Sequence, residues 1–245
     1  MLDNVTLSNV MMIDIETAPC VASFDELPER MQRLWEYKAD RINKYEEEAQ
    51  SPADLFFERG GIYAEFGRII CISAGIFKQE EGQYQFRIKS FYGKDEKTLL
   101  QNFTEMLDNN FSIQKNSICA HNGKEFDYPY ISRRCLVHSL KLPKMLDVSG
   151  KKPWETEHLM DTMNLWRFGD FKNFTSLDLL AAIFGIETPK DDIKGSDVAK
   201  VFWKDDDLER IKVYCEKDII TLARVFMHFK GIEPLGDEQL IFTDT

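Results

Sequence analysis

The sequence lacks several features that define common classes of protein. It holds five cysteines in 245 residues, an odd number, far apart and without any C-x-x-C pair, so we expect neither a disulfide framework nor a zinc cluster. It has no apolar run long enough to span a bilayer, and its first residues carry no basic stretch followed by an apolar core. We therefore expect a cytoplasmic protein that is neither secreted nor inserted in a membrane.

An excess of positive charge is also missing. The formal net charge is −11, which argues against a protein that holds DNA or RNA mainly through a broad cationic surface. It does not argue against a nucleic-acid enzyme that works through metal ions. The charge is uneven, because residues 1–66 carry 6 Lys/Arg against 14 Asp/Glu, whereas residues 121–155 carry 7 against 4. A polyanion is therefore expected to meet the second region.

The composition is that of an ordinary globular protein. With 43% hydrophobic and 12% aromatic residues in 245, the chain can bury a substantial core. Residues 24–58 are rich in Glu, Arg, Lys and Ala with spaced Leu, Met, Trp and Tyr, a pattern typical of one or two exposed amphipathic helices. We expect a single domain over 1–232 with a helical insertion at about 24–58, followed by a loose tail at 233–245.

Hydrophobic periodicity predicts the order of the elements. Strands are expected at 9–16, 68–77, 83–93, 116–123 and 157–166. Outside the insertion, helices are expected at 96–111, from Asp127 onward, at 176–186 and at 206–229. The polar segment 78–82 has the length of a hairpin loop. An antiparallel start followed by helix-linked strands predicts an α/β fold, with a mixed sheet covered by helices on both faces.

Two carboxylates stand in the first strand, within "MMIDIETAP". Asp14 and Glu16 are two residues apart, so in a strand they point to the same face, whereas Ile13 and Ile15 point to the other. Two such carboxylates repel each other and are costly to bury without a cation. The plain alternative is that Glu16 ends the strand in solvent, and D-x-E is a common tripeptide.

Further carboxylates occur at two later positions. Asp127 follows the strand and turn that end in "HNGKEF", and it is equally well explained as a helix N-cap. Tyr214 and Asp218 are four residues apart in the last helix and so share a face, although Tyr214 could be a core aromatic. Asp218 stands among apolar residues, where an unpaired carboxylate is costly.

Together these carboxylates indicate a metal site. Clustered carboxylates with few His or Cys select hard divalent ions such as Mg²⁺ or Mn²⁺. Two such ions, about 3.5 to 4 Å apart, stabilise the attacking and leaving oxygens of a phosphoryl displacement.

The same residues carry a family resemblance. "DIET" (Asp14, Glu16), "NGKEFD" (Asp127) and "YCEKD" (Tyr214, Asp218) fall in the order of the three motifs of the DEDD 3′-to-5′ exonucleases. Over about residues 9–230 the chain resembles their tyrosine subclass (DEDDy), in particular the bacterial proteins related to the proofreading domain of family B DNA polymerases. The histidine subclass has His where this chain has Val213. We therefore expect His121, His138, His158 and His228 to be structural or surface residues.

The resemblance implies a ribonuclease-H-like (DnaQ-like) fold and the stepwise release of nucleoside monophosphates from single-stranded DNA or RNA 3′ ends. It implies that Asp14, Glu16 and Asp218 hold the metal that binds the attacking water, that Asp14 shares in a second metal, and that Asp127 acts mainly through water. Tyr214 would orient the water. Since no polymerase sequence follows residue 230, we expect no editing in cis.

Other residues are candidates for substrate binding. Thr17 follows the first motif, and Asn122 is equally well explained by a turn role. Phe126 either packs in the core or stacks against a terminal base. Several basic side chains are candidates for binding phosphates: Arg133, Arg134, Lys141, Lys144, Lys151 and Lys152. The alternative is that they are scattered surface charges. We expect Asp161 to serve as a cap or to support the site.

Two rival functions remain open at this point. A catalytically inactive nucleic-acid or protein-binding module could use the same fold, although a binding role would not require the full carboxylate set. A metal-dependent phosphodiesterase acting on small nucleotides would share the chemistry and suit the acidic charge. The acidic helical insertion is expected to form a lid or a protein-binding face beside the active site.

Overall fold

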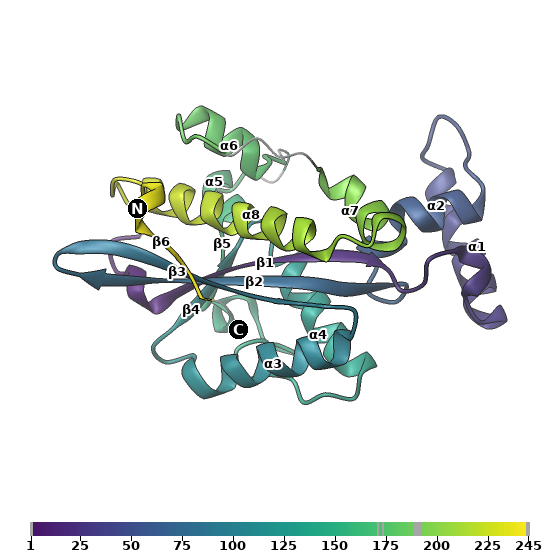
Figure 1. Cartoon of the computed structure of the whole chain (residues 1–245), viewed down its shortest axis with the longest axis horizontal. Coiled ribbons are helices and arrows are strands. Elements are labelled where there is room, and N and C mark those ends of the chain that lie inside the picture. Colours follow the sequence, from purple (N-terminus) through teal and green to yellow (C-terminus); the bar gives the residue numbers. More distant parts are fainter. Residues whose placement is uncertain (1, 171, 173, 189–192, 244–245) are drawn as a thin grey trace.

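Strand β1 (Val10–Pro19), which carries Asp14 and Glu16, lies inside a six-stranded sheet of order β5-β4-β1-β2-β3-β6 (Figure 1). The computed structural model describes residues 2–170, 172, 174–188 and 193–243. The remaining strands are β2 (Gly67–Glu80), β3 (Gln83–Tyr92), β4 (Ser117–Ala120), β5 (Leu159–Asp161) and β6 (Leu240–Phe242). β1 pairs antiparallel with β2 and parallel with β4, so the sheet is mixed, as predicted.

Strands β2 and β3 form the predicted hairpin, but its loop is shorter than the expected 78–82. Lys78, Gln79 and Glu80 still pair with β3, which leaves Glu81 and Gly82 as a two-residue turn. Both have positive φ, 51° and 85°, the backbone conformation of the type I′ turns that fit the twist of a hairpin. The strands therefore continue well past the last strongly apolar residue of β2.

Helices cover both faces of the sheet (Figure 1). On one side lie α3 (Glu96–Asn110) and α4 (Asp127–Val137), and on the other lie α5 (Thr162–Arg167), α6 (Leu177–Ile183), α7 (Val198–Lys200) and α8 (Leu208–Phe229). A short π-helical turn, Val201–Asp205, joins α7 to the segment before α8. Among the described helices, none is both long and apolar enough to cross a membrane.

The alternation of β1 divides the core between these two layers. Met11, Ile13 and Ile15 belong to a buried cluster that includes residues of α3 and α4. Val10 and Met12 belong to a second cluster that includes the inner face of α8. Asp14 continues this second series, so it lies on the face opposite Ile13 and Ile15, as predicted, and the structure places α8 on that face.

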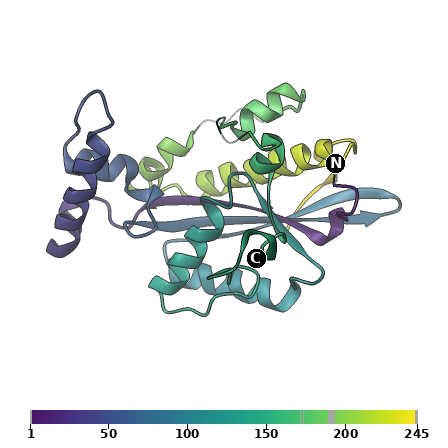
Figure 2. The same cartoon turned by 180° about the vertical axis from the view of Figure 1, so that it is seen from behind.

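The insertion after β1 forms two helices, α1 (Glu29–Asn43) and α2 (Pro52–Arg59), as predicted. They stand at one end of the sheet in both views, coloured dark blue and purple (Figures 1 and 2). Trp35 is fully buried between them, and its Nε1 donates a hydrogen bond to the Pro52 carbonyl at 2.7 Å. The insertion therefore has a small core of its own around one indole.

The strand predicted at 157–166 is wrong beyond its first residues. β5 contains three residues, and α5 begins at Thr162. Asp161 ends the strand and caps the helix, because its carboxylate accepts hydrogen bonds from the amides of Met163 and Asn164. An aspartate that caps a helix overrides the apolar pattern that follows it.

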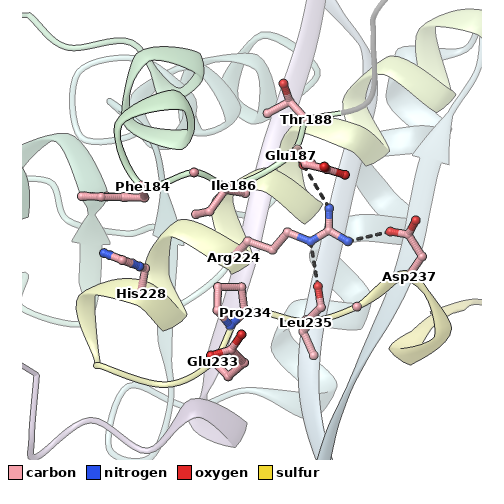
Figure 3. A pocket seen from close by; sticks show the side chains of 12 residues that line it. Phe184, Ile186, Glu187, Thr188, Arg224, His228, Glu233, Pro234, Leu235 and Asp237 are labelled. Carbon is pink, nitrogen blue, oxygen red and sulfur yellow. Dashed lines mark hydrogen bonds and ion pairs between the residues drawn. The ribbon is translucent and has the colours of Figure 1, made fainter.

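The expectation of a loose tail after residue 232 is also wrong for the part that is described. β6 pairs parallel with β3 and extends the sheet. Arg224 of α8 donates hydrogen bonds to the Leu235 carbonyl at 3.0 Å and to Asp237 at 2.6 Å (Figure 3). This segment is therefore packed against α8; the last two residues of the predicted tail, 244–245, lie outside the described residues.

Candidate active site

Asp14 and Glu16 lie side by side on β1 and face α8. In the antiparallel ladder Asp14 is paired with Ser73 and Glu16 with Cys71, and the register shifts directly after Glu16. Glu16 is 8% exposed. The bulge ends the regular alternation at this point, a feature common beside active sites. The strand thus places two carboxylates on one face directly before its pairing register with β2 shifts.

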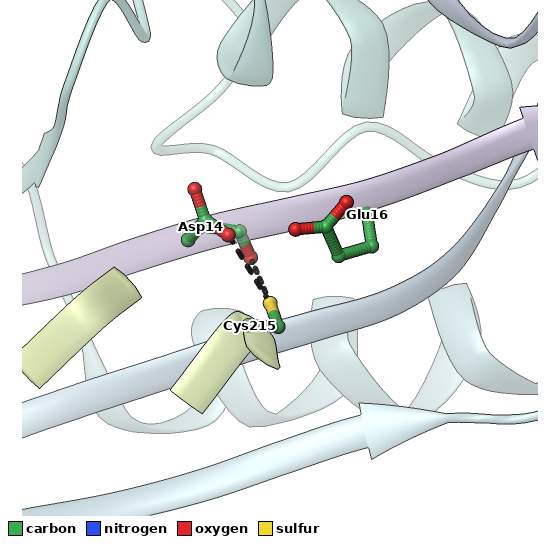
Figure 4. Close-up of side chains that lie close together, drawn as sticks. All are labelled: Asp14, Glu16 and Cys215. Atoms are coloured by element: carbon green, nitrogen blue, oxygen red, sulfur yellow. Dashed lines mark hydrogen bonds between the residues drawn. The ribbon is translucent and has the colours of Figure 1, made fainter. Parts of the chain in front are cut away.

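Helix α8 brings a thiol to these carboxylates. Cys215 Sγ donates a hydrogen bond to Asp14 Oδ2 at 3.3 Å, and it lies 3.5 Å from the Asp14 carbonyl oxygen (Figure 4). One ligand-type atom from each of Asp14, Glu16 and Cys215 falls within 4.8 Å of the others. The sequence predictions did not include Cys215. Its position directly after Tyr214 and three residues before Asp218, on the same side of a helix, was the signal that could have indicated it.

The other predicted carboxylates are also close to Asp14. Burial raises the pKa of Asp14 well above its ordinary value, and the negative charges of Asp218 and Asp127 raise it further. Burial likewise raises the pKa of Glu16, followed by the charges of Asp14 and Asp218. Such repulsion requires proximity, since charges in water interact weakly beyond a few ångströms. The structure therefore brings together carboxylates from β1, α4 and α8.

Asp127 is the first residue of α4 and is not its N-cap, which corrects one of the two interpretations of this residue. Its side chain is 4% exposed and lies at the amides of Asp127 itself and of Ile15 on β1. Burial raises the pKa of this carboxyl to about 7, although these amides lower it. Asp127 thus contacts the backbone of the strand that carries Asp14.

The donor set suits a hard divalent cation. The carboxylates of Asp14 and Glu16, whose pKa values the charges of Asp218 and Asp127 raise further, offer with them the oxygen ligands that Mg²⁺ and Mn²⁺ prefer. Burial also raises the pKa of the Cys215 thiol well above its ordinary value, which favours the protonated thiol over a thiolate. Its hydrogen bond instead favours the ionised form of Asp14.

Asp161 fixes the loop that leads to Asp127. Besides capping α5, its carboxylate accepts hydrogen bonds from the amides of Asn122 at 3.0 Å and Lys124 at 3.2 Å. Asn122 has a φ of 60°, and its carbonyl accepts from Phe126. These bonds support the turn interpretation of Asn122 and the capping and supporting interpretation of Asp161.

A pocket of about 190 Å³ opens beside Glu16. Its lining includes the predicted residues Thr17 and Phe126, together with residues that sequence reasoning missed: Glu58, Gly61, Ile62, Gly195, Ser196 and Ala199. The missed residues come from the end of the insertion and from the segment around α7, which no motif marks. A larger pocket of about 650 Å³, around Arg224 and His228, contains none of the predicted carboxylates (Figure 3).

The prediction that Arg134 binds substrate is wrong. Its guanidinium is buried and donates to both carboxylate oxygens of Glu96, at 2.8 and 2.6 Å, and to the Ala64 carbonyl at 2.9 Å. A neighbouring arginine, Arg133, is exposed, but at six residues from Asp127 it faces a different side of α4. Of the two arginines, Arg134 therefore has a structural role, and only Arg133 is exposed to solvent.

The four histidines have structural surroundings, as predicted. His121 contacts Thr162 and the Thr175 carbonyl, and His138 lies 2.8 Å from Glu96. His158 contacts the Met145 carbonyl, and His228 stacks on Phe184 with ring centroids 4.1 Å apart. The lysines at 141, 144, 151 and 152 are exposed, and their role in binding phosphate stays a prediction.

The site is thus built from acidic side chains of β1, α4 and α8, which converge at a mixed α/β sheet. The family described as a predicted 3′-5′ exonuclease related to the exonuclease domain of PolB matches residues 62–238. The chain therefore belongs to this family and is a 3′-to-5′ exonuclease by class, as the sequence motifs indicated. The matched range contains Asp127, Tyr214 and Asp218, whereas Asp14, Glu16 and the insertion precede it.

One of the similar solved structures has a TM-score above 0.5 and shows a similar fold. The family B DNA polymerase of the archaeon Pyrobaculum calidifontis has a TM-score of 0.51 at 16% identity, over 90% of this chain and 24% of that one. Product-bound exonuclease I has a TM-score of 0.40 at 12% identity, over 89% and 47%, and the ExoI/SSB-Ct complex 0.40 at 10%, over 89% and 44%. The chain thus spans about a quarter of the polymerase and less than half of exonuclease I. No curated protein matches the sequence. The fold is ribonuclease-H-like, as predicted.

Proposed function

We propose that this chain is a two-metal-ion exonuclease that hydrolyses the last phosphodiester bond at the 3′ end of single-stranded DNA or RNA and releases nucleoside 5′-monophosphates. The observation that supports this most strongly is the convergence of Asp127 of α4 and Asp218 of α8 on Asp14 and Glu16 of β1, whose pKa values their charges raise. A fold alone would not require four carboxylates at one place.

The carboxylates would hold Mg²⁺ or Mn²⁺. Asp14, Glu16 and Asp218 are the proposed ligands of one ion, Asp14 also of a second, and Asp127 contributes mainly through water. When bound, the ions lower the pKa of the attacking water and neutralise charge on the phosphate. In the reaction a water oxygen bonds to phosphorus, the bond from phosphorus to the upstream 3′ oxygen breaks, and that oxygen takes up a proton.

The residues of this chain would orient those partners. Tyr214 lies one helical turn before Asp218, and its phenol is proposed to position the water by a hydrogen bond; with an ordinary pKa of about 10 it is an unsuitable full base at neutral pH. Cys215 would keep Asp14 ionised and oriented. Thr17 and Phe126 line the pocket beside Glu16 and are proposed to contact the terminal nucleotide. Asn122 would act through the loop, and Arg133 is proposed to contact a phosphate.

The insertion is proposed to be part of the same functional unit. Glu58, Gly61 and Ile62 border the pocket beside Glu16, so the end of the insertion forms one wall of the site. A protein partner bound to the acidic part of the insertion, and a cytoplasmic location, are the further elements of this proposal. We infer one catalytic domain that includes the insertion and, because β6 joins the sheet, extends beyond residue 232.

One experiment tests the proposal. DNA and RNA oligonucleotides labelled at the 5′ end are incubated with Mg²⁺ or Mn²⁺ and with the wild type, Asp14→Ala or Asp218→Ala. A matched control is Glu105→Ala, which removes an exposed carboxylate from α3. We expect a ladder shortened from the 3′ end with the wild type and the control, and none with the two site variants.

The other outcomes separate the rivals. Oligonucleotides that stay intact with every protein, yet bind equally well, would favour the inactive binding module. Hydrolysis of dinucleotides without any shortening of longer strands would favour a small-nucleotide phosphodiesterase. Nucleoside monophosphates identified by chromatography would establish the product, and the DNA and RNA arms would show which polymer is preferred.

A further inference from the structure

Helix α1 of the insertion carries three different stripes along its length. At about 100° per residue, its inner face is formed by Met31, Trp35, Ala39 and Ile42, which belong to the core of the insertion. A second stripe is acidic and contains Glu29, Glu36 and Asp40. The insertion is acidic as a whole, but its charge is thus confined to part of the surface of α1.

The third stripe is basic and aromatic and faces outward. It contains Arg30, Arg33, Leu34, Tyr37 and Arg41, which follow the spacing i, i+3, i+4, i+7 and i+11 of one helix face. Tyr37 is 67% exposed, Leu34 is 50% exposed and the side chain of Arg33 is 63% exposed. Arg33 forms an ion pair with Glu29 at the border with the acidic stripe. This outer face of α1 therefore presents cations around an exposed phenol.

The end of the insertion is fixed relative to the catalytic strand. The Tyr130 hydroxyl of α4 donates to the Gly61 carbonyl at 2.6 Å, directly after the insertion. Gly61 itself packs so closely on Ala18 that an added Cβ would come within about 3.0 Å of its backbone. On the other side, the Trp203 indole donates to the Pro19 carbonyl at 3.0 Å. The insertion is thus anchored to the end of β1, beyond which α1 stands out (Figures 1 and 2).

We propose that the outer face of α1 binds the sugar–phosphate backbone of the substrate strand upstream of its 3′ end. This inference rests on the proposed exonuclease function. Arginines bind phosphate through their forked donors, and an exposed phenol provides a platform for a base. In a chain of net charge −11, a polyanion needs such a local cationic track to approach carboxylates that repel it. The bound class is a single nucleic-acid strand, recognised without regard to its sequence.

The test compares long and short substrates. The double variant Arg30→Glu/Arg41→Glu reverses charge on the outer face, and Tyr37→Ala removes the platform. Glu36→Gln/Asp40→Asn on the acidic stripe is the matched control. Binding to a 5′-fluorescent strand of about 20 nucleotides, longer than most single-strand sites, is measured in Ca²⁺ by anisotropy. Hydrolysis of a dinucleotide, which has a single nucleotide upstream of the cleaved bond, is measured in Mg²⁺.

We expect the double variant to bind the long strand about tenfold more weakly, and the slope of log affinity against log salt to fall by about 1.4, or about 0.7 for each lost phosphate contact. Tyr37→Ala is expected to weaken binding without changing that slope. Dinucleotide hydrolysis should stay at the wild-type rate in all variants. The thermal unfolding midpoint should also be unchanged, since the substituted side chains are exposed.

Three results would overturn the inference. Unchanged affinity for the long strand would leave the outer face to a protein partner. An equal loss on the dinucleotide would mean that the substitutions act on the catalytic site. Equal weakening by the control pair would mean that any charge change on α1 has this effect. If instead the wild type binds strands but cleaves nothing, the proposed function fails, while the binding comparison still decides the role of α1.

Discussion

The thiol of Cys215 lies 3.3 Å from Oδ2 of Asp14, so the last helix is joined to the first strand by a hydrogen bond at the centre of the proposed metal site. A neutral thiol beside a carboxylate donates a hydrogen bond without adding charge. It can therefore hold Asp14 in place while leaving the negative charge available for a cation. This contact explains why a cysteine is compatible with a site built from hard oxygen ligands.

Replacing Cys215 tests this relationship. In Cys215→Ala the loss of the donor disfavours ionised Asp14, so we expect the half-saturating Mg²⁺ concentration for exonuclease activity to rise about fivefold, equivalent to ~1 kcal/mol. Cys215→Ser keeps a donor and should stay near the wild type. Cys135→Ala is the control, because Cys135 is equally buried but lies in the cluster that includes α3 and α4. Equal Mg²⁺ requirements in all four proteins would contradict the assigned role.

The metal-free protein should lose stability as the pH rises. Burial raises the pKa of Asp127 from 3.8 to about 7, so between these values the folded state binds more protons than the unfolded state, and the free energy of unfolding falls with pH. A shift of about three units corresponds to up to about 4 kcal/mol. Urea unfolding in EDTA at pH 5 and pH 8 measures the loss, and added Mg²⁺ should reverse it.

The matched variant for this prediction is Asp127→Asn, which should remove that part of the pH dependence. The comparison is needed because burial lowers the pKa values of His121 and His158, and these groups make stability rise with pH over part of the same range. The difference between wild type and variant isolates the carboxyl. A wild-type stability that rises more steeply with pH than that of the variant would contradict the prediction.

The sequence was sufficient for the parts of the fold that depend on local periodicity. The apolar run of β1, the amphipathic spacing of α3 and the long α8 are all found where predicted. The convergence of Asp14, Asp127 and Asp218 was predictable only because three motifs in a known order imply one arrangement. Without the order of the motifs, local roles such as a solvent-exposed strand end for Glu16 or a helix cap for Asp127 explain the carboxylates equally well.

The remaining features depend on contacts between segments far apart in the chain. Nothing in "SRRC" tells which arginine is buried, because the partner of Arg134 is Glu96, 38 residues earlier. β6 has only three residues and so a weak strand pattern. The segment before it is held by Arg224 of α8. The sequence does not predict that β5 ends at Asp161, because the apolar residues that follow suit a strand as well as a helix. Only the capping bonds decide between them.

Tyr214 should act in the chemical step. We expect Tyr214→Phe to lower kcat by about 10²-fold or more, the usual effect of removing a group that positions a proton in the transition state, with little change in KM. Tyr92→Phe is the matched control, since the Tyr92 hydroxyl also contacts α8 but binds the exposed Glu209. Steady-state cleavage of a 5′-labelled strand at saturating Mg²⁺ measures kcat and KM for the two variants. A wild-type kcat in Tyr214→Phe would remove Tyr214 from the proposed mechanism.

The adjacent arginines of α4 should behave in opposite ways. Burial alone would raise the pKa of Glu96, yet its bonds with Arg134 lower it, so Arg134→Met would leave a buried carboxylate short of its main partner. We expect a loss of about 3 to 5 kcal/mol in the free energy of unfolding, measured in urea, with KM unchanged for the folded fraction. Arg133→Met, at an exposed position, should cost less than about 0.5 kcal/mol. If Arg134→Met instead raised KM while leaving the unfolding curve in place, the guanidinium would be a substrate contact after all, and the ion pair with Glu96 would be a resting arrangement that nucleic acid displaces.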